Sequence, residues 1–150
     1  MSLVRIILGS KTDLAIGEDV KVMLEKFGIP YDFHISSAHR KPEQTMKLAA
    51  GAEKDGIKVI IAIAGMAAHL PGVVASHTIL PVIGVPVKGS SLSGEDALYS
   101  IVQMPTGVPV ATVAINGGKN AAILACQILG TSLPQHAEAL HNYKLELANS

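Results

Sequence analysis

The chain has 150 residues, and its 12 lysines and arginines balance its 12 aspartates and glutamates, so that the formal charge is zero. This balance excludes a general attraction to nucleic acid or to a membrane surface, and 49% hydrophobic residues exclude a disordered chain. Only 16% of the residues are charged, which makes the chain more apolar than one core of this size requires. We therefore expect a single domain over residues 1–150 that buries additional apolar surface between subunits.

Short branched apolar runs alternate with segments of helical spacing along the chain. Runs typical of buried strands cover residues 3–8, 31–35, 58–64, 81–85 and 109–115. Helical spacing covers residues 14–27, 42–55, 67–76, 95–102, 120–129 and 133–147. Strands that alternate with helices pair in parallel, and continuous apolar strands are buried on both faces. The pattern predicts a three-layer α/β domain with a flavodoxin-like, doubly wound, five-stranded parallel sheet.

The closing helix and the isolated histidines and cysteine carry weaker signals. The last segment follows a Thr-Ser-Leu-Pro break and carries four leucines, so we expect its helix to pack on a neighbouring subunit. Cys126 is the single cysteine, which favours a cytoplasmic location and a buried thiol. We expect His34 and His77 to be structural, and His136 and His141 to lie exposed on the last helix.

Polar and small residues follow each predicted strand. In sheets of this type, ligands bind beyond the carboxyl ends of the strands, where the strand order reverses. The segments in question are residues 9–13, 36–40, 65–72, 88–91 and 116–120. Their composition predicts one polar ligand at this edge of the sheet. The histidines in these segments have no cysteine or carboxylate at ligand spacing, so we expect no metal site.

The first of these segments suits a phosphate or a ribose. Gly9 allows a close backbone approach, Ser10 and Thr12 offer hydroxyls, and the helix that follows offers free N–H groups. The alternative is a plain helix cap made by Thr12 or Asp13.

Two further segments bring the groups needed for acid–base chemistry. Arg40 can bind phosphate through its forked guanidinium, and His39 beside it can exchange a proton near neutral pH. The alternative is a turn capped by Ser37 with a surface arginine. His69 follows the next strand in a setting of small residues, which would let a planar ligand lie against the backbone.

The motifs in these loops carry a family resemblance. The segments GSKTD, SAHRKPE, AGMAAHLPG, LPVIGVPV, SIVQMPTGVPVATVAI and KNAAILA resemble the N5-carboxyaminoimidazole ribonucleotide mutase family, also called the catalytic subunit of phosphoribosylaminoimidazole carboxylase. The resemblance runs from about Val4 to Gly130. It implies a purine-biosynthesis isomerase that moves a carboxylate from the exocyclic nitrogen to ring carbon four. It also implies an octamer with active sites at subunit contacts and without metal or organic cofactor.

The resemblance assigns roles to matching residues. His39 would be the catalytic proton shuttle, and His69 would line the pocket and support it. Asp13 would hold the ribose hydroxyls. The remaining substrate-binding residues would be Ser10 and Thr12 at the phosphoribosyl part, Ser37, Ala38 and Arg40 at the phosphate loop, and Gly65, Met66, Ala67 and Leu70 around the base and carboxylate.

Some positions depart from the family pattern, and two other functions remain open. The usual Gly-Gly-Ala-Ala-His has a methionine at Met66, and the usual Trp is Leu14. One alternative is a direct carboxylase that uses CO2, although that branch typically has Lys in place of Arg40 and lacks AAHLPG. The other is a non-catalytic binding module for a nucleotide or flavin, which the 3% of aromatic residues disfavours.

Overall fold

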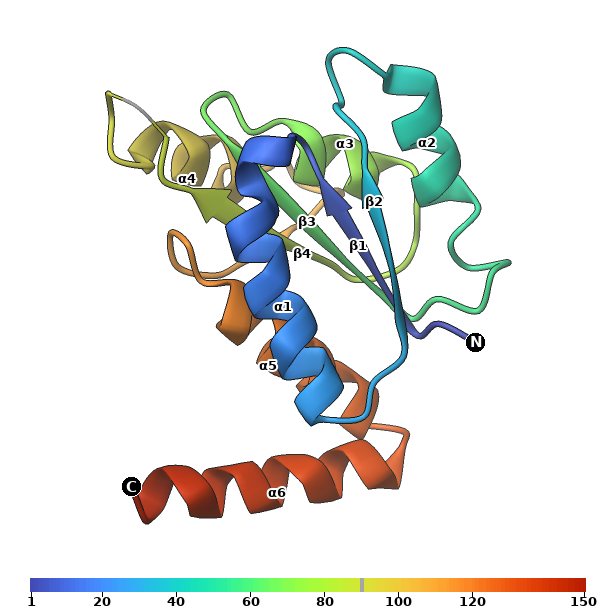
Figure 1. Ribbon diagram of the computed structural model, residues 1–150. Helices are drawn as coiled ribbons and strands as arrows, with labels where there is room; N and C mark the ends of the chain where they lie inside the picture. Colours follow the sequence, from blue (N-terminus) through green and yellow to red (C-terminus); the bar gives the residue numbers. More distant parts are fainter. Residues whose placement is uncertain (90) are drawn as a thin grey trace.

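A computed structural model describes residues 1–89 and 91–150, and it contains the predicted parallel sheet (Figure 1). The strand order is β2-β1-β3-β4-β5, which is the flavodoxin-like order. The strands are β1 (Val4–Leu8), β2 (Tyr31–Ile35), β3 (Val59–Gly65), β4 (Val82–Val87) and β5 (Ala111–Thr112). All neighbours pair in parallel, and the order reverses between β1 and β3.

Helices cover both faces of the sheet, as the sequence predicts. They are the 3-10 turn η1 (Lys11–Asp13) and helices α1 (Leu14–Lys26), α2 (Pro42–Ala50), α3 (Leu70–Ser76), α4 (Glu95–Val102), α5 (Gly118–Gly130) and α6 (Pro134–Ala148). Helices α1 and α5 pack on one face, and α2, α3 and α4 pack on the other. Figure 1 shows α6 outside these layers, against the end of α5.

The strand residues divide between two hydrophobic clusters because side chains alternate across a sheet. On β3, Ile61 and Ile63 face α1 and α5, while Ile60 and Ala62 face α2, α3 and α4, and all four are fully buried. Complete burial of one isoleucine contributes about 1.5–3 kcal/mol. The continuous apolar run that predicted a central strand is therefore the consequence of covering both faces.

The largest differences from the predicted element boundaries occur in three elements. The helix expected over 42–55 ends at Ala50, because the chain turns at Gly51 and returns Ile57 to the core. The helix expected from residue 67 starts at Leu70, where Pro71 occupies the first turn. The strand expected over 109–115 pairs only at Ala111–Thr112, on the sheet edge.

The last helix is partly covered within the chain itself. Phe27 and Tyr143 pack edge to face with ring centroids 5.4 Å apart, and Lys26 forms an ion pair with Glu146 at 2.8 Å. The prediction that His136 is exposed was wrong, because α6 turns this residue toward α5 and leaves it 4% exposed. Among the residues that the structure describes, no helix is both long enough and apolar enough to cross a membrane.

Candidate active site

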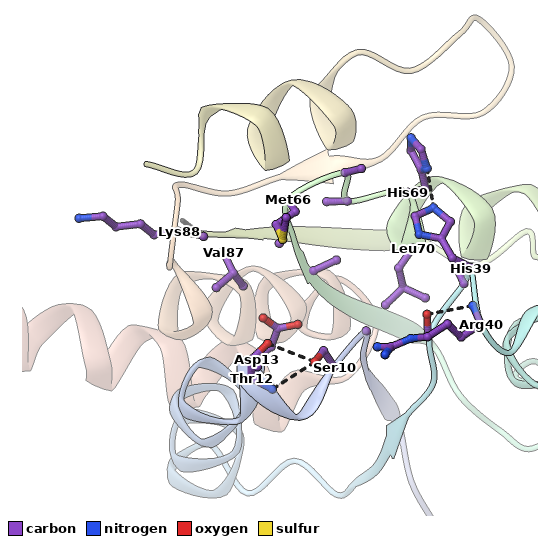
Figure 2. Close-up of a pocket in the computed structure, with 18 residues that line it drawn as sticks. Ser10, Thr12, Asp13, His39, Arg40, Met66, His69, Leu70, Val87 and Lys88 are labelled. Atoms are coloured by element: carbon purple, nitrogen blue, oxygen red, sulfur yellow. Dashed lines mark hydrogen bonds between the residues drawn. The ribbon is translucent and has the colours of Figure 1, made fainter. Parts of the chain in front are cut away.

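A cavity of about 670 Å³ lies beyond the carboxyl ends of the central strands. It opens where the strand order reverses between β1 and β3, which is where the sequence placed the ligand. Figure 2 shows side chains from three separate loops turned toward it. The lining residues are Gly9, Ser10, Thr12, Asp13, Ser37, Ala38, His39, Arg40, Ala64, Gly65, Met66, Ala67, Ala68, His69, Leu70, Val87, Lys88 and Gly89. Every candidate site residue from the sequence is therefore brought together here.

The loop after β1 forms η1 and supplies the hydroxyl side of the cavity. Ser10 caps this turn, since its Oγ accepts from the Thr12 backbone N–H at 3.3 Å and lies 3.1 Å from Thr12 Oγ1. The expected alternative, a cap made by Asp13, was wrong, because Asp13 makes no side-chain cap hydrogen bond to α1. Its carboxylate instead points into the cavity toward Val87 (Figure 2).

Asp13 is a buried acid at the wall of the cavity. The residue is 5% exposed, and this burial raises the pKa of its carboxyl to about 6, while a hydrogen bond with the Ser10 backbone works in the opposite direction. A carboxyl group whose pKa is raised by burial, and which has no cation beside it to offset the loss of hydration, is typical of a functional site. Its oxygens are suited to accept hydrogen bonds from sugar hydroxyls.

The loop after β2 presents His39 and Arg40 to the cavity. The Arg40 backbone N–H donates to Ser37 Oγ at 3.1 Å, and the Lys41 N–H donates to the Ser37 carbonyl at 2.8 Å. Ser37 does therefore cap a turn, as one sequence alternative held, and this turn also exposes both functional side chains. Figure 2 shows the Arg40 side chain reaching along the cavity in the direction of Ser10.

His39 and His69 meet across two different loops. His39 Nε2 lies 2.7 Å from His69 Nδ1, and the ring planes are inclined by 85°. At this distance one nitrogen donates and the other accepts. The contact therefore links the tautomers of the two rings, and a proton gained by one ring determines the role of the other. Both rings are exposed to the cavity.

The loop after β3 forms the remaining wall. A Cβ on Gly65 would lie 3.3 Å from the Val87 carbonyl oxygen and 3.9 Å from Asp13 Oδ1, so glycine allows β3, β4 and Asp13 to approach one another. Met66 has φ 54°, in the left-handed region that long side chains rarely adopt, and its side chain is 59% exposed over the cavity. Strain of this kind is typical of ligand sites.

The sequence argument named the loop after β4 but assigned no site residue to it. In the structure, Val87, Lys88 and Gly89 line the cavity, and the end of the Lys88 side chain points outward (Figure 2). Ser90 belongs to the same predicted segment and lies outside the described residues. Asn116 accepts from the Lys88 N–H at 2.9 Å, so the loop after β5 supports the site without lining it. Sequence reasoning missed Val87 as a lining residue, although its position at the end of an apolar strand could have indicated it.

Possible metal ligands are dispersed. Within residues 1–89 and 91–150, no group of three or more His, Cys, Asp or Glu side chains is arranged to hold a metal ion.

Comparison with known proteins agrees with the family resemblance of the loop motifs and extends it over nearly the whole chain. Residues 3–150 match the AIR carboxylase family. The N5-carboxyaminoimidazole ribonucleotide mutase of Thermotoga maritima is 58% identical over 144 residues, which are 96% of this chain and 84% of that protein. The mutase of the same name from Pyrococcus horikoshii is 55% identical over 97% of this chain and 82% of its own length.

Other relatives are longer or have solved structures. The phosphoribosylaminoimidazole carboxylase of Schizosaccharomyces pombe is 56% identical over 93% of this chain, which corresponds to 25% of that longer protein. The crystal structure of Treponema denticola PurE superposes with a TM-score of 0.91 at 33% identity and covers 99% of this chain and 93% of its own. By sequence, by fold and by the loops that surround its cavity, the chain belongs to the AIR carboxylase family.

Proposed function

We propose that this chain converts N5-carboxyaminoimidazole ribonucleotide into 4-carboxyaminoimidazole ribonucleotide, with His39 as the proton shuttle. Relatives named for this mutase reaction are 51–58% identical and match nearly the whole chain. The observation that carries the proposal is the 2.7 Å contact between His39 and His69 at the edge of a cavity that also holds Arg40 and Asp13. The enzyme is then an isomerase of purine biosynthesis.

The polar groups of the cavity suit a small anion with a phosphate, a ribose and a carboxylate. Arg40 and Ser37 bind the phosphate, since a guanidinium fork matches two phosphate oxygens. Asp13 accepts from the ribose hydroxyls, and Ser10 and Thr12 supply hydroxyls beside it. Ala38, Gly65, Ala67 and Leu70 leave a flat, mostly apolar space for the aminoimidazole ring and its carboxylate.

One imidazole can both supply the proton that the reaction consumes and accept the proton that it releases. When the bond between the carboxylate carbon and the exocyclic nitrogen breaks, His39 gives a proton to that nitrogen and CO2 is released into the cavity. After ring carbon four attacks the CO2, the same carbon must lose its hydrogen as a proton, which returns to His39. The protons given and taken are equal, as an isomerisation requires. His69 positions the His39 ring through their hydrogen bond.

The intermediate CO2 must stay in the cavity until it reacts again. Ala67, Ala68 and the Met66 side chain form an apolar wall, and water exclusion there prevents the loss of CO2. In the single chain the cavity is open, and several large apolar side chains elsewhere are exposed, including Ile79, Leu145 and Leu147. We therefore include in the proposal a homo-oligomer, octameric by resemblance, in which α6 packs on a neighbouring copy and that neighbour closes the site.

Two broader assignments belong to the same proposal. The chain acts as one catalytic domain over residues 1–150. We place it in the cytoplasm, because its single cysteine is buried and unpaired. Burial raises the pKa of the Cys126 thiol to about 11, so this thiol takes no part in nucleophilic chemistry.

Direct carboxylation is the second candidate, because fungal relatives that contain this region carry the carboxylase name. The two reactions differ in substrate. Purified protein is mixed either with the carboxyamino ribonucleotide or with aminoimidazole ribonucleotide and bicarbonate, and product is followed by NMR. Turnover of the first mixture well above the second supports the mutase. Turnover of the second mixture alone contradicts it.

A further inference from the structure

A pair of buried hydroxyls lies beneath the loop that carries His39 and Arg40. Ser36 is 1% exposed, Thr45 is fully buried, and their side-chain oxygens are 2.7 Å apart. The Ser36 backbone N–H donates to the carbonyl of Leu8 at 2.8 Å, which extends the pairing of β2 with β1 by one residue. Thr45 belongs to the first half of α2. The pair therefore connects the ends of β1 and β2 to α2.

The Thr45 hydroxyl reaches both ends of this loop. Its Oγ1 lies 3.0 Å from the carbonyl oxygen of Lys41 and 3.3 Å from that of Ser37. A hydroxyl has one hydrogen to donate and two positions to accept. Both groups are satisfied when Ser36 donates to Thr45 and Thr45 shares its single hydrogen between the carbonyl oxygens of Lys41 and Ser37. The loop that presents His39 is thus held from below by one directional chain of hydrogen bonds.

Fold stability alone gives little reason for two hydroxyls at this place. The surrounding cluster on this face of the sheet is apolar and includes Ala49 and Leu48. Replacing both partners of a buried hydrogen bond by apolar groups of similar shape is often nearly neutral for stability. A threonine that bonds to the carbonyl four residues earlier does not strengthen a helix. What the hydroxyls add is a set of hydrogen bonds with a defined direction, and these bonds fix the position of residues 37–41.

We propose that Ser36 and Thr45 are positioning residues, which hold the loop over residues 37–41 so that His39 meets His69 and Arg40 faces the phosphate. This inference rests on the proposed function, since that function defines what the loop must hold. It adds two residues that do not line the cavity. A displacement of about 1 Å at a reacting group can reduce catalysis about a hundredfold.

The first test replaces the hydroxyl while keeping the shape. In Thr45→Val, we expect kcat to fall and KM to rise together, with kcat/KM reduced about 10- to 100-fold. Thr45→Ser should restore both constants to within about threefold, because it keeps the donor. A displaced loop should change kcat and KM together, because it moves both His39 and Arg40. Loss of a single side chain should change mainly one constant: kcat in His39→Asn and KM in Arg40→Ala.

A matched control and a double variant separate positioning from stability. Ser100 donates to the Asp96 carbonyl at 2.8 Å on α4, away from the cavity, and Ser100→Ala should leave both constants unchanged. The double variant Ser36→Ala with Thr45→Val leaves no unpaired hydroxyl, so its thermal unfolding should return toward that of the unaltered protein while kcat/KM stays low. Recovery of normal kinetics in a stable double variant overturns the proposal. So does a Thr45→Ser variant as impaired as Thr45→Val.

The proposal can also be read without turnover. In Thr45→Val, the NMR signals of the His39 and His69 ring protons should shift, because the 2.7 Å contact between the rings changes. Unchanged ring signals overturn the positioning role. Failure of the unaltered protein to convert the carboxyamino ribonucleotide overturns the proposed function instead, so the two failures are distinguishable.

Discussion

Two arginines, Arg5 on a strand and Arg40 on a loop, have opposite surroundings. Arg5 on β1 is 5% exposed, and its guanidinium donates to Asp32 at 2.9 and 3.0 Å, to Asp55 at 3.0 Å and to the Leu48 carbonyl at 2.9 Å. Arg40 lies on an exposed loop, with its side chain along the cavity. The first arginine is saturated by its own chain, and the second is available to a ligand.

The same contrast applies to the acids. Asp32 and Asp55 neutralise Arg5 and connect β1, β2 and the turn after α2. Asp13 is just as buried as Arg5, yet it lies against the cavity without a cation beside it among the described residues. Charged groups that are paired inside the chain stabilise the fold, whereas Asp13 and Arg40 line the cavity and are proposed to bind the substrate. Substitutions in the two regions should therefore affect different quantities.

The largest expected effect is on catalysis. His39→Asn removes the proposed proton shuttle and should lower kcat about a hundred- to ten-thousand-fold. Binding of the ribonucleotide, measured by calorimetry, should be retained, because Arg40 and Asp13 are unchanged. A kcat near normal would assign the proton transfer to another group.

The counterpart in the structural cluster is Arg5. Arg5→Met leaves Asp32 and Asp55 without their shared guanidinium and should lower the free energy of unfolding by about 1–2 kcal/mol, because both carboxylates keep access to water. Denaturant titration measures this loss, and kcat per folded molecule should stay normal. Normal stability together with reduced kcat would place Arg5 in the site and break the comparison.

Arg40→Ala should show the reverse pattern. Loss of a charged hydrogen-bonding group costs about 1.5–3 kcal/mol of binding, so KM should rise about 10- to 100-fold while the free energy of unfolding stays unchanged. Calorimetry with inorganic phosphate and with the ribonucleotide checks the assignment. Unchanged affinity for both ligands would remove Arg40 from the phosphate site.

Asp13 sharpens the comparison through pH. The carboxyl loses its proton near pH 3.8 in the unfolded chain and near pH 6 in the folded protein, so the folded state binds the proton more tightly. The tighter proton binding stabilises the folded state fully below about pH 4, and this contribution is lost as the pH rises through about 6. Asp13→Asn should remove this slope and increase stability at pH 8 by about 3 kcal/mol, while KM rises. A less stable Asn variant at pH 8 contradicts the assignment.

Sequence patterns predicted the fold and the residues that line the cavity, because both depend on local features. Branched apolar runs marked the buried strands, and polar residues after them marked the cavity. Contacts between distant segments had no such pattern: the burial of His136 between α6 and α5, the position of the Asp13 carboxylate at the cavity and the Ser36–Thr45 pair all depend on tertiary packing. The early end of α2 also follows from a tertiary demand, the return of Ile57 to the core.

The most direct test of the central claim follows the carboxylate itself. The carboxyamino ribonucleotide is prepared with a ¹³C-labelled carboxylate and converted in an excess of unlabelled bicarbonate. Transfer within one closed cavity predicts that the 4-carboxy product retains the ¹³C label in its carboxylate. A product that carries unlabelled carbon, with the label recovered in the bicarbonate pool, would contradict the account.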